Sequence, residues 1–168
     1  WLAATQNVVV VSIAYRLNAF GYLGGSDALR ARDERDGSAG NYGQQDQRMA
    51  LRWVQRNIRG FGGNPDSVFV FGQSSGAGSV ASHLVSERSW PFFQRAGLES
   101  GSYANWIAVS WEASERQFRG LVKGLGCSAQ SEEAEIECML GKNATMVVGA
   151  TTTNAPCRDG CPWAPVVD

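Results

Sequence analysis

The chain has 168 residues, with 15 lysines and arginines against 16 aspartates and glutamates, and 43% of its residues are hydrophobic. This length allows one domain with a hydrophobic core, while the near-zero net charge gives no indication of a nucleic-acid partner. No apolar run in the sequence reaches the length of a membrane span. Because the chain starts at Trp1 and stops on residues 166–168, which resemble a strand cut short, we expect a fragment of a longer protein.

The first predicted element is a strand over residues 7–15, where β-branched residues form a nearly continuous run. Such a run is typical of a central strand in a parallel sheet that is covered on both faces, so an α/β architecture is expected. The next segment, residues 26–40, is polar and charged. Its composition predicts a solvated surface loop, to which we assign no function.

A helix is predicted over residues 41–59, because its apolar side chains fall largely on one face. These side chains are Met49, Leu51, Trp53, Val54 and Ile58. The glycines and the proline in residues 61–66 then end the helix. A strand, this helix and a second strand in order predict a right-handed βαβ unit.

The pattern G-Q-S-S-G at residues 72–76 lies between a predicted strand over residues 68–71 and a predicted helix over residues 77–87. A strand, a sharp turn and a helix form the setting of a nucleophile elbow, in which the central serine has a strained backbone. The alternative interpretation is a glycine- and serine-rich turn with no chemistry.

In a nucleophile elbow the residues two before and two after the serine crowd together. Gly72 and Gly76 are therefore expected to be required as glycines. The Ser74 hydroxyl would be exposed at the carboxyl edge of the sheet, and the Ser75 N–H at the start of the helix would face an oxyanion.

The rest of the chain is predicted to contain one more strand and two helices. The strand covers residues 96–101, and the amphipathic helices cover residues 111–125 and 131–140. The tail over residues 151–165 contains three prolines and is expected to be a loop.

The four cysteines all lie in the last quarter of the chain, at Cys127, Cys138, Cys157 and Cys161. Their spacings contain no C-x-x-C, and the one histidine, His83, is distant in sequence, so two short disulfide loops are favoured over a metal site. Disulfides indicate an oxidising compartment, and a glycosylation sequon at Asn143 points the same way. We therefore expect a secreted protein or one in the secretory pathway.

Several segments occur in the order in which one family of enzymes has them. They are VVVVSIAYRL (8–17), FGYL (20–23), GNYG (40–43), DQR (46–48), ALRWV (50–54), FGGNP (61–65), GQSSG (72–76), ESGS (99–102) and PVVD (165–168). Together they resemble the type-B carboxylesterase and cholinesterase family of α/β-hydrolases. The resemblance covers nearly the whole chain. It implies a single partial α/β-hydrolase domain over residues 1–168, with mostly parallel strands, flanking helices and a nucleophile elbow.

The resemblance implies that Ser74 is the acyl-forming nucleophile and that the Ser75 N–H is one oxyanion donor. The family places the other oxyanion donors upstream of Trp1, and its catalytic acid and histidine well downstream of the elbow. Because His83 lies on the elbow helix itself, we expect it to be a packing or surface histidine. The catalytic acid and base are therefore expected beyond Asp168.

Other positions match supporting roles in the family. Ser100 matches a hydroxyl close to the nucleophile, and Trp106 lies about where the acyl pocket is lined. Arg16 and Asp46 match a structural ion pair. Gln73 departs from the family, because many members have a glutamate before the nucleophile. The missing negative charge favours neutral carboxylic esters over choline esters as substrates.

The resemblance also implies a disulfide between Cys127 and Cys138. A loop of this size stabilises a fold by about 3 kcal/mol in the chain-entropy model. Cys157 and Cys161 match no position in the family, so their pairing is inferred from their local spacing only.

The implied function is hydrolysis of small carboxylic esters through an acyl-enzyme on Ser74, with no metal and no organic cofactor. The 168-residue chain alone is expected to be inactive, because it would lack the catalytic acid and base. The alternatives are a non-catalytic adhesion or structural protein on the same fold, and a lipase. The oligomeric state is left open.

Overall fold

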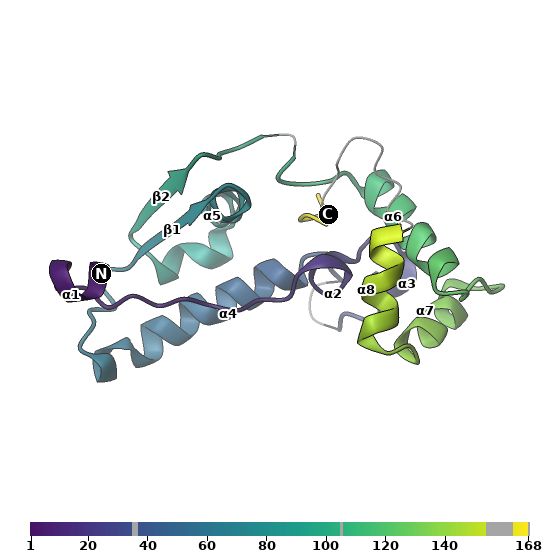
Figure 1. The fold of residues 1–168 in the computed structure, drawn as a ribbon, viewed down its shortest axis with the longest axis horizontal. Helices are drawn as coiled ribbons and strands as arrows, with labels where there is room; N and C mark the ends of the chain where they lie inside the picture. Colours follow the sequence, from purple (N-terminus) through teal and green to yellow (C-terminus); the bar gives the residue numbers. More distant parts are fainter. Residues whose placement is uncertain (35–36, 105, 154–162, 168) are drawn as a thin grey trace. The chain divides into compact units, whose positions relative to one another are not determined.

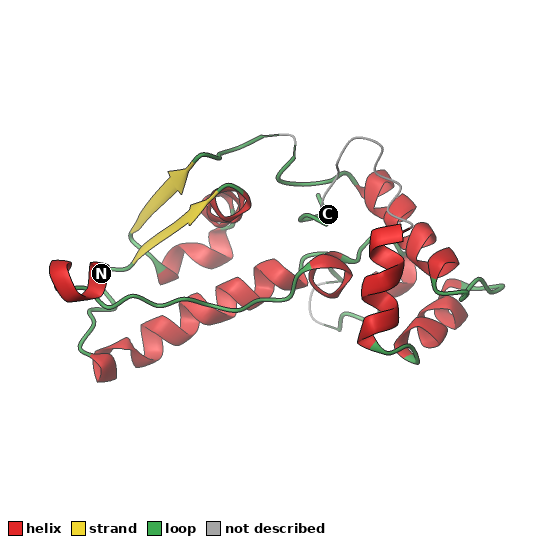
Figure 2. Cartoon of the chain, viewed as in Figure 1, coloured by secondary structure: helices red, strands yellow, loops and turns green. Residues whose placement is uncertain are grey.

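The computed structural model describes residues 1–34, 37–104, 106–153 and 163–167. The chain divides into two compact units, each made of two segments. We call Trp1–Tyr15 with Gln44–Ile107 the sheet unit, and Arg16–Gly43 with Ala108–Asp168 the helical unit. Their elements are labelled in Figure 1, and Figure 2 shows the same chain coloured by secondary structure. The expectation of one domain stays a prediction.

The sheet unit contains two parallel strands and the helices that accompany them. Its elements are α1 (Leu2–Gln6), most of α4 (Tyr42–Asn57), η1 (Ile58–Phe61), β1 (Phe69–Gln73), α5 (Ser75–Val85), η2 (Glu87–Phe92) and β2 (Arg95–Glu99). β1 pairs with β2 in a register that runs from Phe69 opposite Arg95 to Gln73 opposite Glu99. α5 lies between the strands in sequence and packs against both (Figure 1). The predicted strands over residues 68–71 and 96–101 are confirmed, shifted by a residue or two.

The two faces of β1 differ in burial, as expected for a strand with a period of two. Val70 and Gly72 are partly buried, and Gly72 lies against the start of α5. Phe69 and Phe71 point the other way and are 54% and 50% exposed. Their rings stack with centroids 5.6 Å apart. The helix α5 therefore covers one face of this strand.

The prediction of a central strand over residues 7–15 is wrong for this structure. These residues form no strand, and Val8, Val10 and Ile13 are 49%, 50% and 40% exposed. A strand needs a neighbour that exchanges backbone hydrogen bonds with it, and none of the described residues pairs with this segment. The predicted βαβ unit with residues 7–15 as its first strand is therefore absent from the described part of the chain.

The predicted helix over residues 41–59 is confirmed as α4 followed by η1. Leu51, Val54 and Ile58 of its apolar face are buried. Met49 and Trp53 are 54% and 44% exposed. The apolar face of α4 is therefore only partly covered by the residues that pack against it. 

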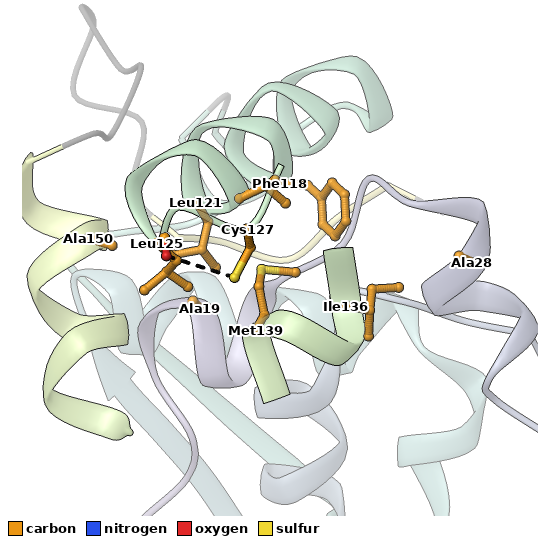
Figure 3. Close-up of a cluster of buried hydrophobic side chains, with 10 residues drawn as sticks. Ala19, Ala28, Phe118, Leu121, Leu125, Cys127, Ile136, Met139 and Ala150 are labelled. Atoms are coloured by element: carbon orange, nitrogen blue, oxygen red, sulfur yellow. Dashed lines mark hydrogen bonds between the residues drawn. The ribbon is translucent and has the colours of Figure 1, made fainter. Parts of the chain in front are cut away.

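The helical unit is built around one hydrophobic cluster. Its elements are α2 (Asn18–Tyr22), α3 (Asp27–Ala31), α6 (Trp111–Gly124), α7 (Glu132–Leu140) and α8 (Ala144–Thr153). Figure 3 shows the cluster, in which α6 and its C-cap Leu125 supply most of the large side chains. Its buried members are Ala19, Ala28, Phe118, Leu121, Val122, Leu125, Cys127, Ile136, Met139 and Ala150. The predicted helices over residues 111–125 and 131–140 are confirmed.

A disulfide between Cys127 and Cys138 joins the segment after α6 to α7, with the two Cα atoms 5.5 Å apart. This pairing, implied by the resemblance, is confirmed. Cys157 and Cys161 lie outside the described residues, and their pairing stays a prediction.

The prediction that residues 26–40 form a solvated loop is wrong for their first part. Ser26 is 2% exposed, and its hydroxyl accepts a hydrogen bond from the Leu29 N–H over 3.2 Å as the N-cap of α3. The same hydroxyl donates to the Glu132 carboxylate on α7 over 2.6 Å. Ala28 then joins the hydrophobic cluster. A polar sequence forms a buried helical turn here because its polar atoms have partners on α7.

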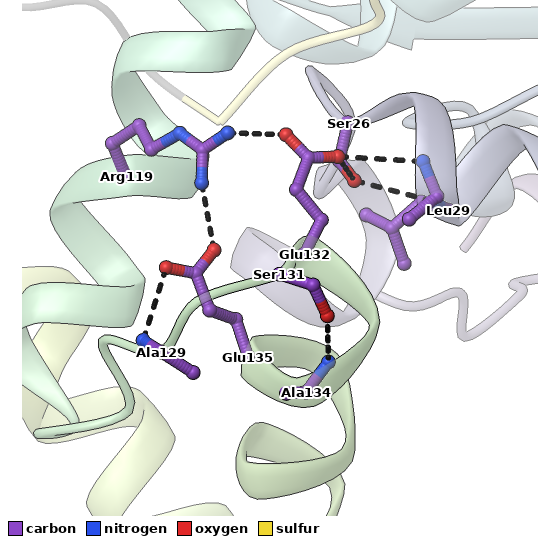
Figure 4. A network of polar contacts seen from close by, with 9 residues as sticks. Ser26, Leu29, Arg119, Ala129, Ser131, Glu132, Ala134 and Glu135 are labelled. Carbon is purple, nitrogen blue, oxygen red and sulfur yellow. Dashed lines mark hydrogen bonds and ion pairs between the residues drawn. The ribbon is translucent and has the colours of Figure 1, made fainter.

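Charged side chains around α7 form a connected network, drawn in Figure 4. Arg119 of α6 forms ion pairs with both Glu132 and Glu135. Burial opposes ionisation of Glu132, yet hydrogen bonds from Ser26 and Ala28 and the Arg119 charge together hold the pKa of its carboxyl below the ordinary value. This network ties α3, α6 and α7 to one another.

The tail over residues 151–165 is only partly the predicted loop, because α8 extends to Thr153. Near the end of the chain, Val166 forms a parallel bridge with Val109. The Asn41 side-chain oxygen accepts a hydrogen bond from the Val166 N–H over 2.9 Å, and its amide nitrogen donates to the Val166 carbonyl over 3.1 Å. Gly40, with φ +86°, leaves room for Val166, since a Cβ there would lie 2.4 Å from its side chain.

Candidate active site

Ser74 lies at the carboxyl end of β1, immediately before α5, with φ 53° and ψ −117°. This conformation is rare for a residue other than glycine. Two backbone hydrogen bonds hold it: the Ser74 N–H donates to the Glu99 carbonyl over 2.9 Å, and the Ser74 carbonyl accepts from the Gly78 N–H over 3.1 Å. The strained residue is therefore fixed from β2 on one side and from α5 on the other.

The turn around Ser74 is tight, and one of its two glycines is required by contact. A Cβ on Gly72 would lie 2.4 Å from the Gly76 carbonyl carbon. A Cβ on Gly76 would meet no atom within 4 Å. The expectation that both positions must lack a side chain therefore holds for Gly72 and is wrong for Gly76. The two glycines differ because a Cβ on Gly72 would point at the helix, whereas a Cβ on Gly76 would point into open space.

The Ser74 side chain is exposed, and at the N-cap position of α5 it makes no capping hydrogen bond within the described structure. A serine at this position usually caps the helix. Ser75 is the first residue of this 11-residue helix, so its N–H is one of the terminal amides without an intrahelical acceptor. The helix dipole adds partial positive charge at this end. The arrangement presents an uncapped hydroxyl beside a backbone donor.

The end of β2 lies beside the end of β1, because Gln73 and Glu99 are opposite each other in the parallel register. Ser100 follows directly and also has a positive φ, 51°. Gly101 comes next, and a Cβ there would lie 2.7 Å from the Ser74 carbonyl oxygen. The structure thus brings Ser100 and Ser74 to one edge of the sheet. Sequence reasoning did not find Glu99 and Gly101 as contacts of Ser74, because both act through backbone geometry.

Trp106 stands against the amino-terminal part of α5. A Cβ on Gly78 would lie 3.5 Å from the Trp106 ring and 2.7 Å from the Ile107 side chain. Gly78 is four residues after Ser74, one helical turn along α5. Trp106 is 42% exposed and lies at the same end of this helix as the serine.

Gln73, Arg16 and Asp46 were the other predicted positions. Gln73 is the last residue of β1 and is exposed next to Ser74, so the side chain before the serine is an uncharged amide. Arg16 belongs to the helical unit, where its guanidinium lies 5.5 Å from the centre of the Tyr42 ring, while Asp46 belongs to the sheet unit. Their ion pair stays a prediction.

His83, the only histidine in the chain, is 3% exposed. Its Nδ1 lies 2.9 Å from the Ser89 hydroxyl, and its Nε2 lies 2.9 Å from the Gln47 side-chain oxygen. Burial first, and the Arg48 charge second, lower the pKa of the imidazole from 6.5 to about 4. His83 is therefore neutral at pH 7, and both of its ring nitrogens are engaged. The prediction of a packing histidine is confirmed, and a surface position is excluded.

The donors and acceptors around His83 assign its tautomer. Arg48 donates to the Ser89 hydroxyl oxygen over 3.2 Å, and Ser89 then donates to the Nδ1 of His83. The Nε2–H is left to donate to Gln47, whose amide nitrogen donates to Ser79 over 3.2 Å. This chain of hydrogen bonds ties α4, α5 and η2 together and leaves no ring nitrogen for proton transfer.

Within the described part of the chain, no group of three or more histidine, cysteine, aspartate or glutamate side chains is placed to hold a metal ion. Among these residues, no helix is long and apolar enough to cross a membrane.

The sequence was compared with known proteins. A sequence model of the carboxylesterase family matches residues 1–168. The chain is 40% identical to acetylcholinesterase of Bungarus fasciatus, over 100% of this chain and 27% of the relative. It is 44% identical to cholinesterase of Mus musculus, over 85% of this chain and 23% of the relative. It is 38% identical to acetylcholinesterase of Myxine glutinosa, over 100% of this chain and 48% of the relative. The chain therefore spans less than half the length of these relatives, and it belongs to the carboxylesterase family.

Proposed function

We propose that the longer protein containing this chain hydrolyses carboxylic esters, with Ser74 as the nucleophile. The observation that carries the proposal is the backbone of Ser74, which is exposed, uncapped and held at φ 53° between a strand and a helix. Strain of this kind persists only where the surroundings impose it, and it gathers at functional sites. Membership of the carboxylesterase family supports the same conclusion and implies an α/β-hydrolase fold.

The proposed reaction has two acyl-transfer steps. A base takes the proton of the Ser74 hydroxyl as its oxygen bonds to the ester carbonyl carbon, and the carbonyl oxygen becomes an oxyanion. The Ser75 N–H is the donor that this chain supplies to the oxyanion, and one such donor is worth about a hundredfold to a thousandfold in turnover. The ester C–O bond then breaks and the alcohol leaves with the proton. Water hydrolyses the acyl-enzyme by the same sequence of steps.

The catalytic acid and base are proposed to lie in parts of the longer protein outside this chain. His83, the one histidine present, has both ring nitrogens occupied by Ser89 and Gln47. Loss of the base alone costs about a millionfold in turnover in serine hydrolases. The chain of 168 residues by itself is therefore expected to be inactive.

Neutral esters are the proposed substrate class. Gln73 places an uncharged amide beside Ser74, so this position adds no negative charge to attract a cationic choline group. Trp106, which stands one turn along α5 from the serine, is proposed to line the acyl pocket. Ser100, at the adjacent strand end, is proposed as a supporting hydroxyl near the nucleophile. A lipase remains compatible with these residues, whereas the retained serine argues against a purely structural protein.

A secreted or secretory-pathway location is proposed from two features. The Cys127–Cys138 disulfide requires an oxidising compartment to persist. Asn143, in the sequon, is exposed just before α8, where its side-chain oxygen accepts the Met146 N–H over 3.0 Å. Its amide nitrogen is the atom that a glycan would modify.

Hydrolysis by the full-length protein tests the function and the substrate class together. Wild-type protein should hydrolyse 4-nitrophenyl acetate, and Ser74→Ala should lower turnover by about a millionfold, to the background rate. Ser82→Ala is the matched control, because Ser82 lies on the same helix and, among the described residues, its hydroxyl bonds only the Gly78 carbonyl of that helix, over 3.1 Å. It should keep wild-type turnover.

Three results would contradict parts of this proposal. Turnover retained by Ser74→Ala would exclude Ser74 as nucleophile. Faster turnover of acetylthiocholine than of the neutral acetate would contradict the substrate preference. No hydrolysis of either ester by the wild type would favour the non-catalytic alternative.

A further inference from the structure

The turn after β2 lies against the peptide group that joins Ser74 to Ser75. That peptide contains the Ser74 carbonyl carbon and oxygen and, at its other end, the Ser75 N–H. A Cβ added to Gly101 would lie 2.7 Å from the Ser74 oxygen and 3.5 Å from the Ser74 carbonyl carbon. It would also lie 2.9 Å from the Ala77 Cβ. Because Gly101 has no side chain, the Ser74–Ser75 peptide group can occupy this space.

We propose that Gly101 is a positioning residue that sets the direction of the Ser75 N–H toward the oxyanion. The inference rests on the proposed function, and it extends that function to a residue 27 positions away in sequence from the serine. Gly101 touches neither substrate nor reacting atoms. It acts through the Ser74–Ser75 peptide plane, which is kept in place because no side chain presses on its oxygen.

The Ser74–Ser75 peptide is the group that an added side chain at position 101 would press on. The Ser74 N–H is fixed by the Glu99 carbonyl over 2.9 Å, and the Ser74 carbonyl is held by the Gly78 N–H over 3.1 Å. A carbonyl oxygen and a new methyl group do not remain 2.7 Å apart, and in this proposal the Ser74 oxygen is the atom that moves. The peptide group is planar, so displacing its oxygen also turns the N–H on the opposite side of the C–N bond. The Ser75 donor would then point away from its acceptor.

An alanine at position 101 adds one methyl group, which would meet the Ser74 carbonyl and the Ala77 Cβ, without forcing a left-handed backbone. Gly101 does not have a positive φ, unlike Gly25, Gly40 and Gly62 in the same chain. Alanine therefore introduces no backbone strain there, and its effect comes from the methyl group. Gly60→Ala is the matched control: Gly60 lies in the same unit, also without a positive φ, and a Cβ there would meet no atom within 4 Å.

The experiment compares full-length wild type, Gly101→Ala and Gly60→Ala in two assays, ester hydrolysis and the rate of labelling by a fluorophosphonate. Removal of a whole oxyanion donor costs about a hundredfold to a thousandfold, so misdirection of one should lower kcat by about tenfold to a hundredfold. KM should change by less than about threefold, because the donor acts on the transition state. Labelling should slow with kcat, and Gly60→Ala should match the wild type in both assays.

A second variant separates positioning from simple overpacking. Ala77→Gly removes the other atom that the Gly101→Ala methyl group would meet. Gly101→Ala should lower the thermal midpoint of the wild type, and it should lower that of Ala77→Gly by less, because one of its two contacts is then gone. In the double variant kcat and labelling should stay low, because the clash with the Ser74 oxygen remains. A double variant restored in kcat as well as in thermal midpoint would overturn the proposal, since overpacking against Ala77 would then explain the loss.

The remaining outcomes are also decisive. Gly101→Ala with wild-type kcat and labelling rate would refute the role of Gly101 and leave the proposed function intact. A loss that appears in KM rather than kcat would refute it as well. A wild-type protein that neither hydrolyses esters nor is labelled would overturn the proposed function, and this inference with it.

Discussion

At the scale of single residues, the hydrogen-bond chain through His83 shows how a buried imidazole is used as a structural part. Each polar atom in the chain from Arg48 through Ser89 and His83 to Gln47 has a partner, which is the condition for burying such groups. The neutral ring is the form that fits, because Nδ1 must accept and Nε2 must donate. Protonation would place a second donor opposite the Ser89 hydroxyl and next to the Arg48 charge.

This arrangement predicts a loss of stability in acid. The pKa of His83 is about 4 in the folded protein and 6.5 as an ordinary value, so between these pH values the unfolded state binds the extra proton. The contribution of neutral His83 to the free energy of unfolding is therefore fully present above pH 6.5. It falls as the pH drops toward 4, by about 3 kcal/mol in total. Urea unfolding midpoints of the full-length protein, measured from pH 7 to pH 4, should fall more steeply for wild type than for His83→Gln. Parallel pH profiles of the midpoint for the two proteins would contradict the prediction that His83 causes this loss of stability.

Residue roles could be predicted where the signal is local. The strained turn at Ser74 and the crowding at Gly72 could be predicted because a strand, a sharp turn and a helix lie within twenty residues, while the chemical role of Ser74 stays a proposal. The freedom of Gly76 was not predictable, because it depends on the direction in which a missing side chain would point. The contact of Gly101 with Ser74 was not predictable either, since it arises only when β2 pairs beside β1.

At the scale of elements, α3 shows how one N-cap can anchor a short helix in the protein interior. Ser26 caps the helix and also donates to Glu132 on α7, while Ala28 enters the hydrophobic cluster. The helix has five residues, too short to be stable by itself. Its stability therefore comes from its partners on α7.

The comparison of two N-caps tests this account of α3. Ser131 caps α7 over 3.3 Å and is exposed, whereas Ser26 is 2% exposed and has the additional bond to Glu132. Ser131→Ala should cost about 1 kcal/mol of unfolding free energy, as an exposed cap does. Ser26→Ala should cost about 2–3 kcal/mol, because a carboxylate also loses a donor. Chemical denaturation measures both, and an equal cost would show that the bond to Glu132 contributes nothing.

Elements were predicted correctly where their own sequence pattern decides them. The long helices α4 and α6 have apolar residues with a helical period, and β1 has a compact apolar run before its turn. Residues 7–15 have a strand composition but no partner among the described residues, and composition cannot supply one. The helices α2, α3 and α8 were missed because contacts within the helical unit stabilise them, rather than their local pattern.

At the scale of the whole molecule, the family assignment and the local geometry support each other. The family model covers residues 1–168, yet the chain spans only 27% of the Bungarus fasciatus relative and 48% of the Myxine glutinosa relative. The strained serine, the helix N-terminus beside it and the strand ends that hold it are all present in this chain. The base that would activate the serine is not among its residues by our proposal, so activity is a property of the longer protein.

The central claim is that Ser74 is a nucleophile activated from outside this chain, and the most direct test is the site of covalent labelling. Full-length protein would be treated with a fluorophosphonate, digested and sequenced by mass spectrometry, with the isolated chain of residues 1–168 treated in parallel. The account predicts one adduct, on Ser74, in the full-length protein only. An adduct on Ser75 or another residue would contradict the assignment of the nucleophile, and labelling of the isolated chain at Ser74 would contradict the external base.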